Sequence, residues 1–391
     1  MNKKVLSLLI LFFSWVMLGY AQNDGKITIK GTVIDQATNQ PLAFVNMGLL
    51  GTMAGVASDI DGKFELVVPD RYATHIIKFS AVGYAPYEMK VYEARDKELK
   101  VALKPVSYGL REVEVYAEAL VYKKLLRDVV ANIGKAYIAK PYNYTGYFKY
   151  GVTVNDDAEK VKESIVNIYD SKGYHRSDVA TAFKEVNYNF NQVRRSEPMK
   201  SVFDGMTYFD DILTADIVRN TRNVLDIANL DEFKLKNKGI LMYEGDSVQV
   251  ISYELSKPSL STTGDVAVSQ CKGEIFINKK DKAVLKNVIQ IKAKDFNILG
   301  RNLVVINEAP KSDVEMVIST NYKKMRSVYF LSGITIAYKY KQEGNSVKGE
   351  MQYITTRVDM DSPTPISGRM YYEDLKTDAA FWNGYTAYFE E

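Results

Sequence analysis

The chain has 391 residues, with 51 lysines and arginines against 48 aspartates and glutamates, so its formal net charge is only +3. This near-neutral balance argues against a nucleic-acid partner and against an anionic membrane surface. The single cysteine, Cys271, permits no internal disulfide, so a hydrophobic core must hold the fold together. With 28 tyrosines and 16 phenylalanines against 10 prolines, the composition favours β-structure.

Residues 1–21 have the three parts of a secretory signal peptide. Lys3 and Lys4 supply the positive start, residues 5–18 form an apolar run, and small residues lead up to Ala21. The run is shorter than the roughly 20 residues that a membrane-spanning helix needs. We therefore expect cleavage after Ala21 and export of the protein. Because Gln22, and not a cysteine, follows that point, we expect no lipid anchor.

Residues 26–105 predict a small β-sandwich. Residues 26–35 alternate apolar and polar side chains with the period of a half-buried strand. A tight turn is expected at residues 59–62, where Gly62 suits a positive φ. Further strands are expected at 42–50, 55–59, 63–68, 76–82, 87–92 and 100–104. About seven short strands at this spacing are typical of a sandwich.

A connector at residues 106–118 and then an amphipathic helix follow the predicted sandwich. Apolar side chains between residues 121 and 133 share one helical face, and charged side chains take the other. We expect Gly134 to end this helix in the C′ position. A second, mostly helical segment is expected at residues 206–227.

Long strands dominate the remainder of the chain, residues 119–391. Two are expected at 145–155 and 163–176, and a ladder of hairpins with turns at 244–246, 280–281 and 343–346 follows the second helical segment. An antiparallel meander of this length must curl to bury one face. The predicted fold class is therefore mainly β: a seven-stranded sandwich followed by a curled antiparallel sheet, a half-barrel, with a few α-helices.

Four motifs in the sandwich region are specific: 31–35 (GTVID), 41–46 (PLAFVN), 58–64 (SDIDGKF) and 79–84 (FSAVGY). With these motifs, residues 27–104 resemble the carboxypeptidase-like regulatory domain, a transthyretin-like β-sandwich of Bacteroidetes envelope proteins. The resemblance implies a transthyretin-like sandwich and a location in the cell envelope. It implies no peptidase activity, because the domain is the accessory module without its enzyme.

Two weaker resemblances concern the residues after the sandwich. Residues 143–148 and the hairpin from 273–277 into 284–288 are similar to the curled sheets of lipoprotein carriers of the LolA/LolB type. Residues 112–117 (EVEVYA) resemble the segment that leads into the plug of TonB-dependent receptors. Because no plug and no long barrel follow, this second resemblance implies only a shared secretion and docking context.

The sequence shows no catalytic or metal-binding constellation. A catalytic zinc ion needs three protein ligands and a general base, whereas this chain has only His75 and His175, neither followed by a glutamate at a suitable spacing. The pair of aspartates in residues 59–62 favours a hairpin turn over a calcium loop. Cys271 is interpreted as an inert thiol. Four acidic residues are interpreted as solvated helix surface or as acids favourably placed near a helix N-terminus: Asp204, Asp210, Asp211 and Asp216. No metal and no cofactor are expected.

Two groups of residues are candidates for ligand contact. The first alternates on one face of a predicted strand and comprises Ile334, Ile336, Tyr338 and Tyr340. If such faces line a covered, curled sheet, the interior could hold an acyl chain; if aromatic side chains fill it, it is only a core. The second is Trp382, in an aromatic cluster near the C-terminus. Such clusters bind sugars or lipids, or pack a terminal segment onto a sheet.

The predicted function is that of an exported, non-enzymatic cell-envelope protein with a binding or assembly role. Its expected location is the periplasm or the outer-membrane surface, with no transmembrane helix after signal cleavage. The expected partner is an envelope protein, a glycan or a lipid. Three alternatives remain: a periplasmic lipid or lipoprotein carrier, a small outer-membrane-associated barrel or accessory protein of a TonB-dependent system, and a hydrolase with an unfamiliar site.

Overall fold

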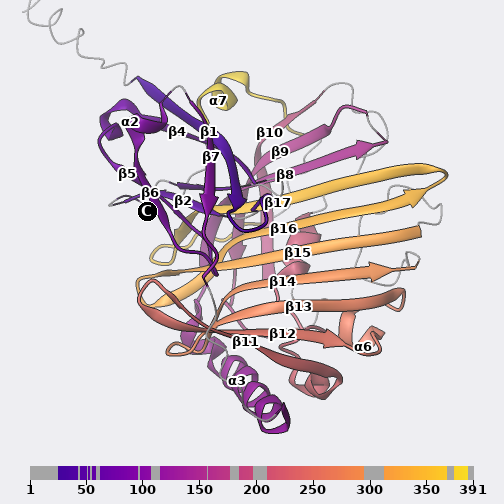
Figure 1. The fold of residues 1–391 in the computed structure, drawn as a ribbon. Helices are drawn as coiled ribbons and strands as arrows, with labels where there is room; N and C mark the ends of the chain where they lie inside the picture. The colour runs from indigo at the N-terminus through magenta and orange to yellow at the C-terminus, as the bar shows by residue number, and fades with distance from the viewer. Residues whose placement is uncertain are drawn as a thin grey trace, which may run out of the picture.

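The computed structural model consists of a small N-terminal β-sandwich and a large antiparallel sheet with helices. It describes residues 25–42, 45–50, 52, 55–58, 62–95, 97–106, 115–155, 157–176, 185–196, 209–294, 312–367 and 374–385. The predicted signal peptide lies outside these residues, as do residues 59–61 and the first half of the EVEVYA stretch, residues 112–114. Figure 1 shows the sandwich, in indigo, beside one end of the strands of the large sheet.

Within the described residues the sandwich has seven strands, as predicted. They are β1 (Lys26–Asp35), β2 (Asn46–Leu49), β3 (Gly55–Ala57), β4 (Lys63–Pro69), β5 (Ile76–Ser80), β6 (Tyr87–Lys90) and β7 (Glu98–Leu103). One sheet has the order β4-β1-β7 and the other β3-β2-β5-β6. Two short helices, η2 (Asp70–Tyr72) and α2 (Val91–Ala94), complete the module. Ile29, Leu66 and Phe79 are fully buried between the two sheets. Gly62 has the predicted positive φ, +72°.

Ten antiparallel strands form the large sheet within the described residues. Their bounds are β8 (Tyr142–Val154), β9 (Lys160–Asp170), β10 (Val186–Arg195), β11 (Phe233–Tyr243), β12 (Asp246–Leu255), β13 (Val268–Asn278), β14 (Ala283–Ala293), β15 (Ser312–Met325), β16 (Val328–Gln342) and β17 (Asn345–Asp359). The order is β10-β9-β8-β17-β16-β15-β14-β13-β12-β11. The meander from β11 to β17 therefore joins the earlier strands through the β17–β8 pair. The curled antiparallel sheet with few helices is confirmed.

The helices differ from the prediction at three points. The first helix, α3 (Val115–Ala136), begins inside the expected connector and runs through Gly134, which does not end it. In the described part of the chain the remaining helices are α5 (Phe209–Ala215), η3 (Ile227–Glu232), α6 (Leu260–Thr263) and α7 (Ala379–Gly384). The expected helical segment at 206–227 is therefore wrong beyond α5. The strand β10 was not predicted.

Two asparagines explain why the helix after residue 209 is short. The Asn220 side chain donates hydrogen bonds to the carbonyls of Leu213, Thr214 and Asp216. The Asn223 side chain donates to backbone carbonyls of the same segment. Such local side-chain-to-backbone bonds offer carbonyls an alternative to helical partners, and so they favour a compact turn over further helix.

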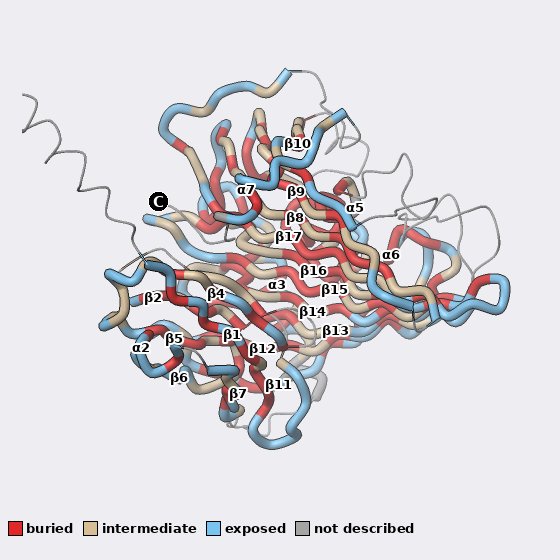
Figure 2. Tube along the Cα trace, turned by 90° about the horizontal axis from the view of Figure 1, so that it is seen from above, coloured by how far each residue is buried: buried red, intermediate tan, exposed pale blue. Residues whose placement is uncertain are grey.

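The large sheet has two chemically different faces. We call the face that carries Ile334 and Ile336 the core face, because their side chains join the buried cluster that also contains the apolar side of α3. We call the opposite face, which carries Ala337 and Lys339, the polar face. Figure 2 shows buried positions recurring across the middle of the strands from β8 to β13. Strand alternation puts successive side chains on opposite faces, so one face contributes to the core and the other lies outside it.

Tyrosines on the core face lie flat over glycines of neighbouring strands. A Cβ atom on Gly146 would lie 2.2 Å from the ring of Tyr353, and one on Gly349 would lie 2.1 Å from the hydroxyl oxygen of Tyr338. Tyr353 is only 1% exposed, so its ring has no free space to move into. The missing Cβ of each glycine therefore makes the room in which a buried aromatic ring packs.

We expect Gly146→Ala to destabilise the protein by about 1–3 kcal/mol, because the added methyl group overpacks the site under Tyr353. The matched control is Gly134→Ala. Gly134 is helical, and a Cβ there would meet nothing within 4 Å, so this change should stabilise by about 1 kcal/mol. Urea unfolding followed by circular dichroism measures both. Equal destabilisation by the two alanines would contradict the packing explanation.

Candidate binding surface

The four strand residues predicted to face a ligand are all buried on the core face. Ile334 is 1% exposed, Ile336 2%, Tyr338 5% and Tyr340 3%. The hydroxyl groups of Tyr338 and Tyr150 share a hydrogen bond of 2.6 Å. The side chains are packed against other residues of one cluster, the arrangement of a core. Contact between these residues and an acyl chain stays a prediction.

Trp382, the second candidate, fixes α7 to the edge strand β10. Its indole N–H donates a hydrogen bond of 2.9 Å to the carbonyl of Val193, and the guanidinium carbon of Arg194 lies 4.8 Å from the ring centre. The rings of Phe381 and Tyr385 pack against it at 5.3 and 5.5 Å. Trp382 is 6% exposed, so this geometry is that of a terminal segment packed onto the sheet. Binding of a ligand by Trp382 stays a prediction.

Both histidines contact other side chains. His75 packs edge-on against the ring of Tyr72, and His175 Nε2 lies 2.6 Å from Glu185 Oε2. Burial by itself raises the pKa of Glu185, but the hydrogen bond from Lys172 and the charge of His175 lower it below its usual range. Among the residues that the structure describes, no three potential ligands lie close enough to hold a metal ion.

The acidic residues interpreted as solvated helix surface have different environments. Asp204 lies outside the described residues, and for Asp211 only the helical backbone is described. Asp210 accepts a hydrogen bond of 2.9 Å from the hydroxyl of Tyr188. The interpretation is wrong for Asp216, which is 3% exposed and accepts a 2.5 Å hydrogen bond from the hydroxyl of Tyr322. Asp216 therefore ties the segment after α5 to β15.

Arg219, in the same segment, forms a buried ion pair with Asp170 of β9. The side chains of Asp170 and Arg219 are 0% and 3% exposed, and their closest oxygen and nitrogen are 2.5 Å apart. Asp170 also accepts hydrogen bonds from the backbone N–H groups of Lys172 and Gly173. The guanidinium of Arg219 lies 4.6 Å from the ring centre of Tyr174. Burial lowers the pKa of Arg219, but the carboxylate of Asp170 raises it well above its usual value overall, so the guanidinium stays charged.

On the polar face, two adjoining hollows form the candidate binding surface. The first encloses about 730 Å³ and crosses strands β8, β17, β16, β15, β14 and β13. The second encloses about 560 Å³, crosses β14, β13, β12 and β11, and reaches Val82 and Tyr84 of the sandwich. Lys272 and Gln290 line both hollows, so we treat them as one polar-face groove.

The strand register shows what forms the groove floor. One row of directly opposed residues crosses eight strands and consists of Gly151, Glu350, Ala337, Val317, Gln290, Lys272, Glu254 and Lys234. The row beside it consists of Thr153, Lys348, Lys339, Glu315, Lys292 and Gln270. Directly opposed residues share one face of a sheet. The groove therefore has small and aliphatic side chains at its centre and charged side chains around them.

Lysines outnumber carboxylates in this groove. The lining lysines are Lys234, Lys236, Lys272, Lys286, Lys292, Lys339 and Lys348. The lining glutamates are Glu159, Glu254, Glu274, Glu315 and Glu350. Glu274 is 3.4 Å from Lys238, and Glu159 is 3.9 Å from Lys149. Because these two lysines line neither hollow, part of the negative charge is neutralised from outside. Burial lowers the pKa of Lys286 to about 8, although Glu274 opposes the shift.

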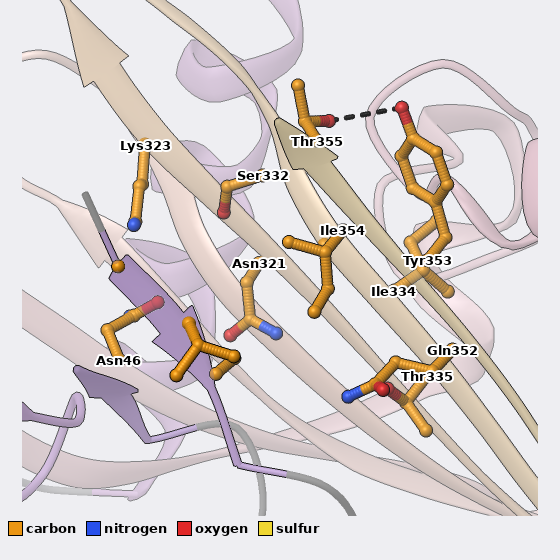
Figure 3. A pocket seen from close by; sticks show the side chains of 14 residues that line it. Asn46, Asn321, Lys323, Ser332, Ile334, Thr335, Gln352, Tyr353, Ile354 and Thr355 are labelled. Atoms are coloured by element: carbon orange, nitrogen blue, oxygen red, sulfur yellow. Dashed lines mark hydrogen bonds between the residues drawn. The ribbon is translucent and has the colours of Figure 1, made fainter. Parts of the chain in front are cut away.

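The sandwich occupies the other end of the same face. Asn46 and Val56 of the sandwich and Asn321, Thr335 and Gln352 of the large sheet line a cavity of only about 40 Å³. Figure 3 shows the Asn46 side chain across this cavity from those of Asn321 and Lys323. The two modules thus approach closely on the polar face, and the groove continues beside the contact.

Comparison with known proteins confirms the N-terminal resemblance. Residues 29–115 match the family model of the CarboxypepD_reg-like domain. The chain is also 28% identical over 135 residues to TonB-dependent receptor P3 of Formosa agariphila. That alignment covers 34% of this chain and 13% of the receptor, so the chain spans only a small part of its relative.

Two solved structures align with part of the chain at low TM-scores. A LolA superfamily protein from Nitrosomonas europaea aligns with a TM-score of 0.25, 9% identity, and coverage of 61% of this chain and 94% of that one. A DUF1329 family protein from Desulfovibrio piger aligns with a TM-score of 0.25, 10% identity, and coverage of 59% and 92%. A protein of the LolA superfamily, the class that the sequence resemblance named, is thus among the structures that align.

We expect Arg219→Met to destabilise the protein by about 3–5 kcal/mol, because it leaves the buried carboxylate of Asp170 without its charged partner. A carboxylate without that partner has a raised pKa. Protonation of that carboxylate removes the buried, unpaired charge. The difference in the free energy of unfolding between variant and wild type should therefore narrow as the pH falls from 7 to about 5. Thermal melts over this pH range test both points.

The control is Arg326→Met. Arg326 pairs with Asp361 at 2.9 Å, but both side chains are more than 60% exposed, at 66% and 64%. Its loss should cost less than about 1 kcal/mol. If the stability lost in Arg219→Met does not change with pH, the effect comes from packing alone and the charge argument is contradicted.

Proposed function

We propose that this chain is an exported, non-enzymatic binding protein of the bacterial cell envelope and that the polar-face groove is its binding surface. The observation that carries the proposal is the contrast between the two faces of the large sheet. The core face is filled by packed side chains, whereas the polar face has a wide, lysine-lined groove that side chains of the sandwich also line.

The N-terminal features support an envelope location. Residues 1–21 have the pattern of a signal peptide, and residues 29–115 match the CarboxypepD_reg-like domain. The relative from Formosa agariphila is a TonB-dependent receptor. For this chain we propose a periplasmic or outer-membrane-associated location. Among the described residues no helix has the length and apolar character required to cross a membrane.

We propose the domain division expected from the sequence. A signal peptide at 1–21 precedes the sandwich at 26–105, and a connector at 106–118 leads to the helix-and-sheet domain at 119–391. The role that we propose is non-enzymatic; in the structure the ring of His75 packs on Tyr72, and that of His175 lies against Glu185.

The first test is export and envelope association. A C-terminally tagged full chain, expressed in a Bacteroidetes host, should lose residues 1–21, so that the mass of the purified protein corresponds to a start at Gln22. It should fractionate outside the cytoplasm and sediment with washed envelope fragments. An unrelated exported protein of similar size is the control. A protein that keeps its first 21 residues in the cytoplasm, or that stays in the supernatant like the control, would refute the proposal.

Native mass spectrometry distinguishes the groove from the carrier alternative. Because the core face is packed with side chains such as Tyr338 and Met351, which are 5% and 0% exposed, we expect gently purified protein to carry no lipid. The measured mass should equal that of the chain alone. A stoichiometric adduct with the mass of a phospholipid or an acyl chain would instead support a lipid carrier.

A further inference from the structure

We propose that the polar-face groove binds an acidic polysaccharide along its length; this rests on the proposed function and adds the class of ligand. The ligand chemistry is a linear chain with many carboxylate or sulfate groups. Four features of the groove support it: the sign of its charge, an unfavourable lysine pair, its length and the nature of its floor.

The charge of the groove favours an anion. Seven lysines and five glutamates line it, and Lys149 and Lys238 approach two of those glutamates from outside. In the described part of the chain neither Lys272 nor Lys348 has an ion-pair partner. Since the whole chain is close to neutral, this excess is a local property of one surface. A net positive charge on a concave surface attracts ligands of the opposite sign.

A pair of opposed lysines supports the same conclusion. Lys339 of β16 and Lys348 of β17 are direct cross-strand neighbours on the polar face. Glu315 lies between Lys339 and Lys292, at 2.8 and 3.0 Å, and so it compensates those two lysines but not Lys348. Like charges directly opposite each other destabilise a sheet. A ligand that brings negative charge to this point would remove that repulsion.

The length of the groove favours a chain over a compact anion. Its floor crosses eight strands, from Lys234 of β11 to Gly151 of β8. Neighbouring strands are about 4.8 Å apart, so seven intervals span roughly 34 Å. The lysines are distributed over β11, β13, β14, β16 and β17 and do not converge on one point. A single phosphate or carboxylate would therefore contact only a few of them, whereas an oligosaccharide could contact most.

The floor of the groove argues against nucleic acid as the ligand. Proteins that bind single-stranded nucleic acid present aromatic rings on which bases stack. Here Phe276 is only 5% exposed and the ammonium of Lys286 lies 5.9 Å from its ring centre, while the hydroxyl of Tyr84 donates a hydrogen bond to Asp35. Ala337 and Val317 at the centre are small enough to admit a wide, polar chain.

The test measures binding of polygalacturonate oligomers to the purified full chain by isothermal titration calorimetry, with neutral dextran oligomers as the uncharged probe. Wild type should bind polygalacturonate and not dextran, and its affinity should fall as sodium chloride rises from 20 to 200 mM, because exposed charge contacts are screened by salt. The triple variant Lys272→Gln/Lys339→Gln/Lys348→Gln should bind roughly tenfold more weakly.

The matched control is Lys124→Gln/Lys135→Gln on α3. Both lysines are exposed and neither lines the groove. This variant should keep the wild-type affinity. Lys348→Gln alone is the most informative change, because it removes the unfavourable opposition to Lys339. It should melt at or above the wild-type temperature and yet bind more weakly, a combination that a purely structural role for Lys348 would not produce.

Four results would overturn the inference. They are equal affinity of wild type and the triple variant, equal binding of dextran and polygalacturonate, tighter binding of a single-stranded oligonucleotide than of polygalacturonate at the same salt, and no binding of polygalacturonate at all. If the chain still sediments with envelopes in any of these cases, the proposed function stands and only the ligand class fails. If it neither sediments nor binds, both fail.

Discussion

The large antiparallel sheet can exist only if one of its faces is removed from water, and most other features of the molecule follow from that requirement. Side chains alternate between the faces, so a continuous apolar set collects on the core face. The helix α3 and the segment that follows α5 cover it. The ion pair of Asp170 and Arg219 and the hydrogen bond from Tyr322 to Asp216 fix that segment in place. Directional polar contacts thus hold the segment after α5 against the core face.

Because the helices cover the core face, the polar face of the sheet is available for other contacts. On the polar face the sandwich meets β15, β16 and β17, and the groove lies beside it. The core face is filled by aromatic rings, such as that of Tyr353 over Gly146, so it leaves no space for a ligand. The same alternation that builds the core therefore also builds the groove. We propose that the ligand binds on the polar face, which is the face of the sheet that does not form the core.

Many of the strands and turns were predicted correctly from short-range sequence patterns. The residues of β1 were predicted with correct bounds because their alternation is a short-range property, and hairpin turns such as the one at Glu343 and Gly344 were found from their residue types. The end of α3 was misjudged, because Gly134 is tolerated inside an exposed helical turn. The helix at 206–227 was overestimated, because composition does not show that Asn220 and Asn223 bind backbone carbonyls.

The sequence alone determined the class of fold, the order of its two modules and the family of the first, because alternation, turn residues and motif spacing act over short distances. It did not determine which charged residues are buried: Asp170 and Arg219 are 49 positions apart and look like any other ionic residues. Nor did it show the groove, whose lysines come from five strands. Only strand register brings such residues onto one face, and register is decided by the packing of the whole sheet.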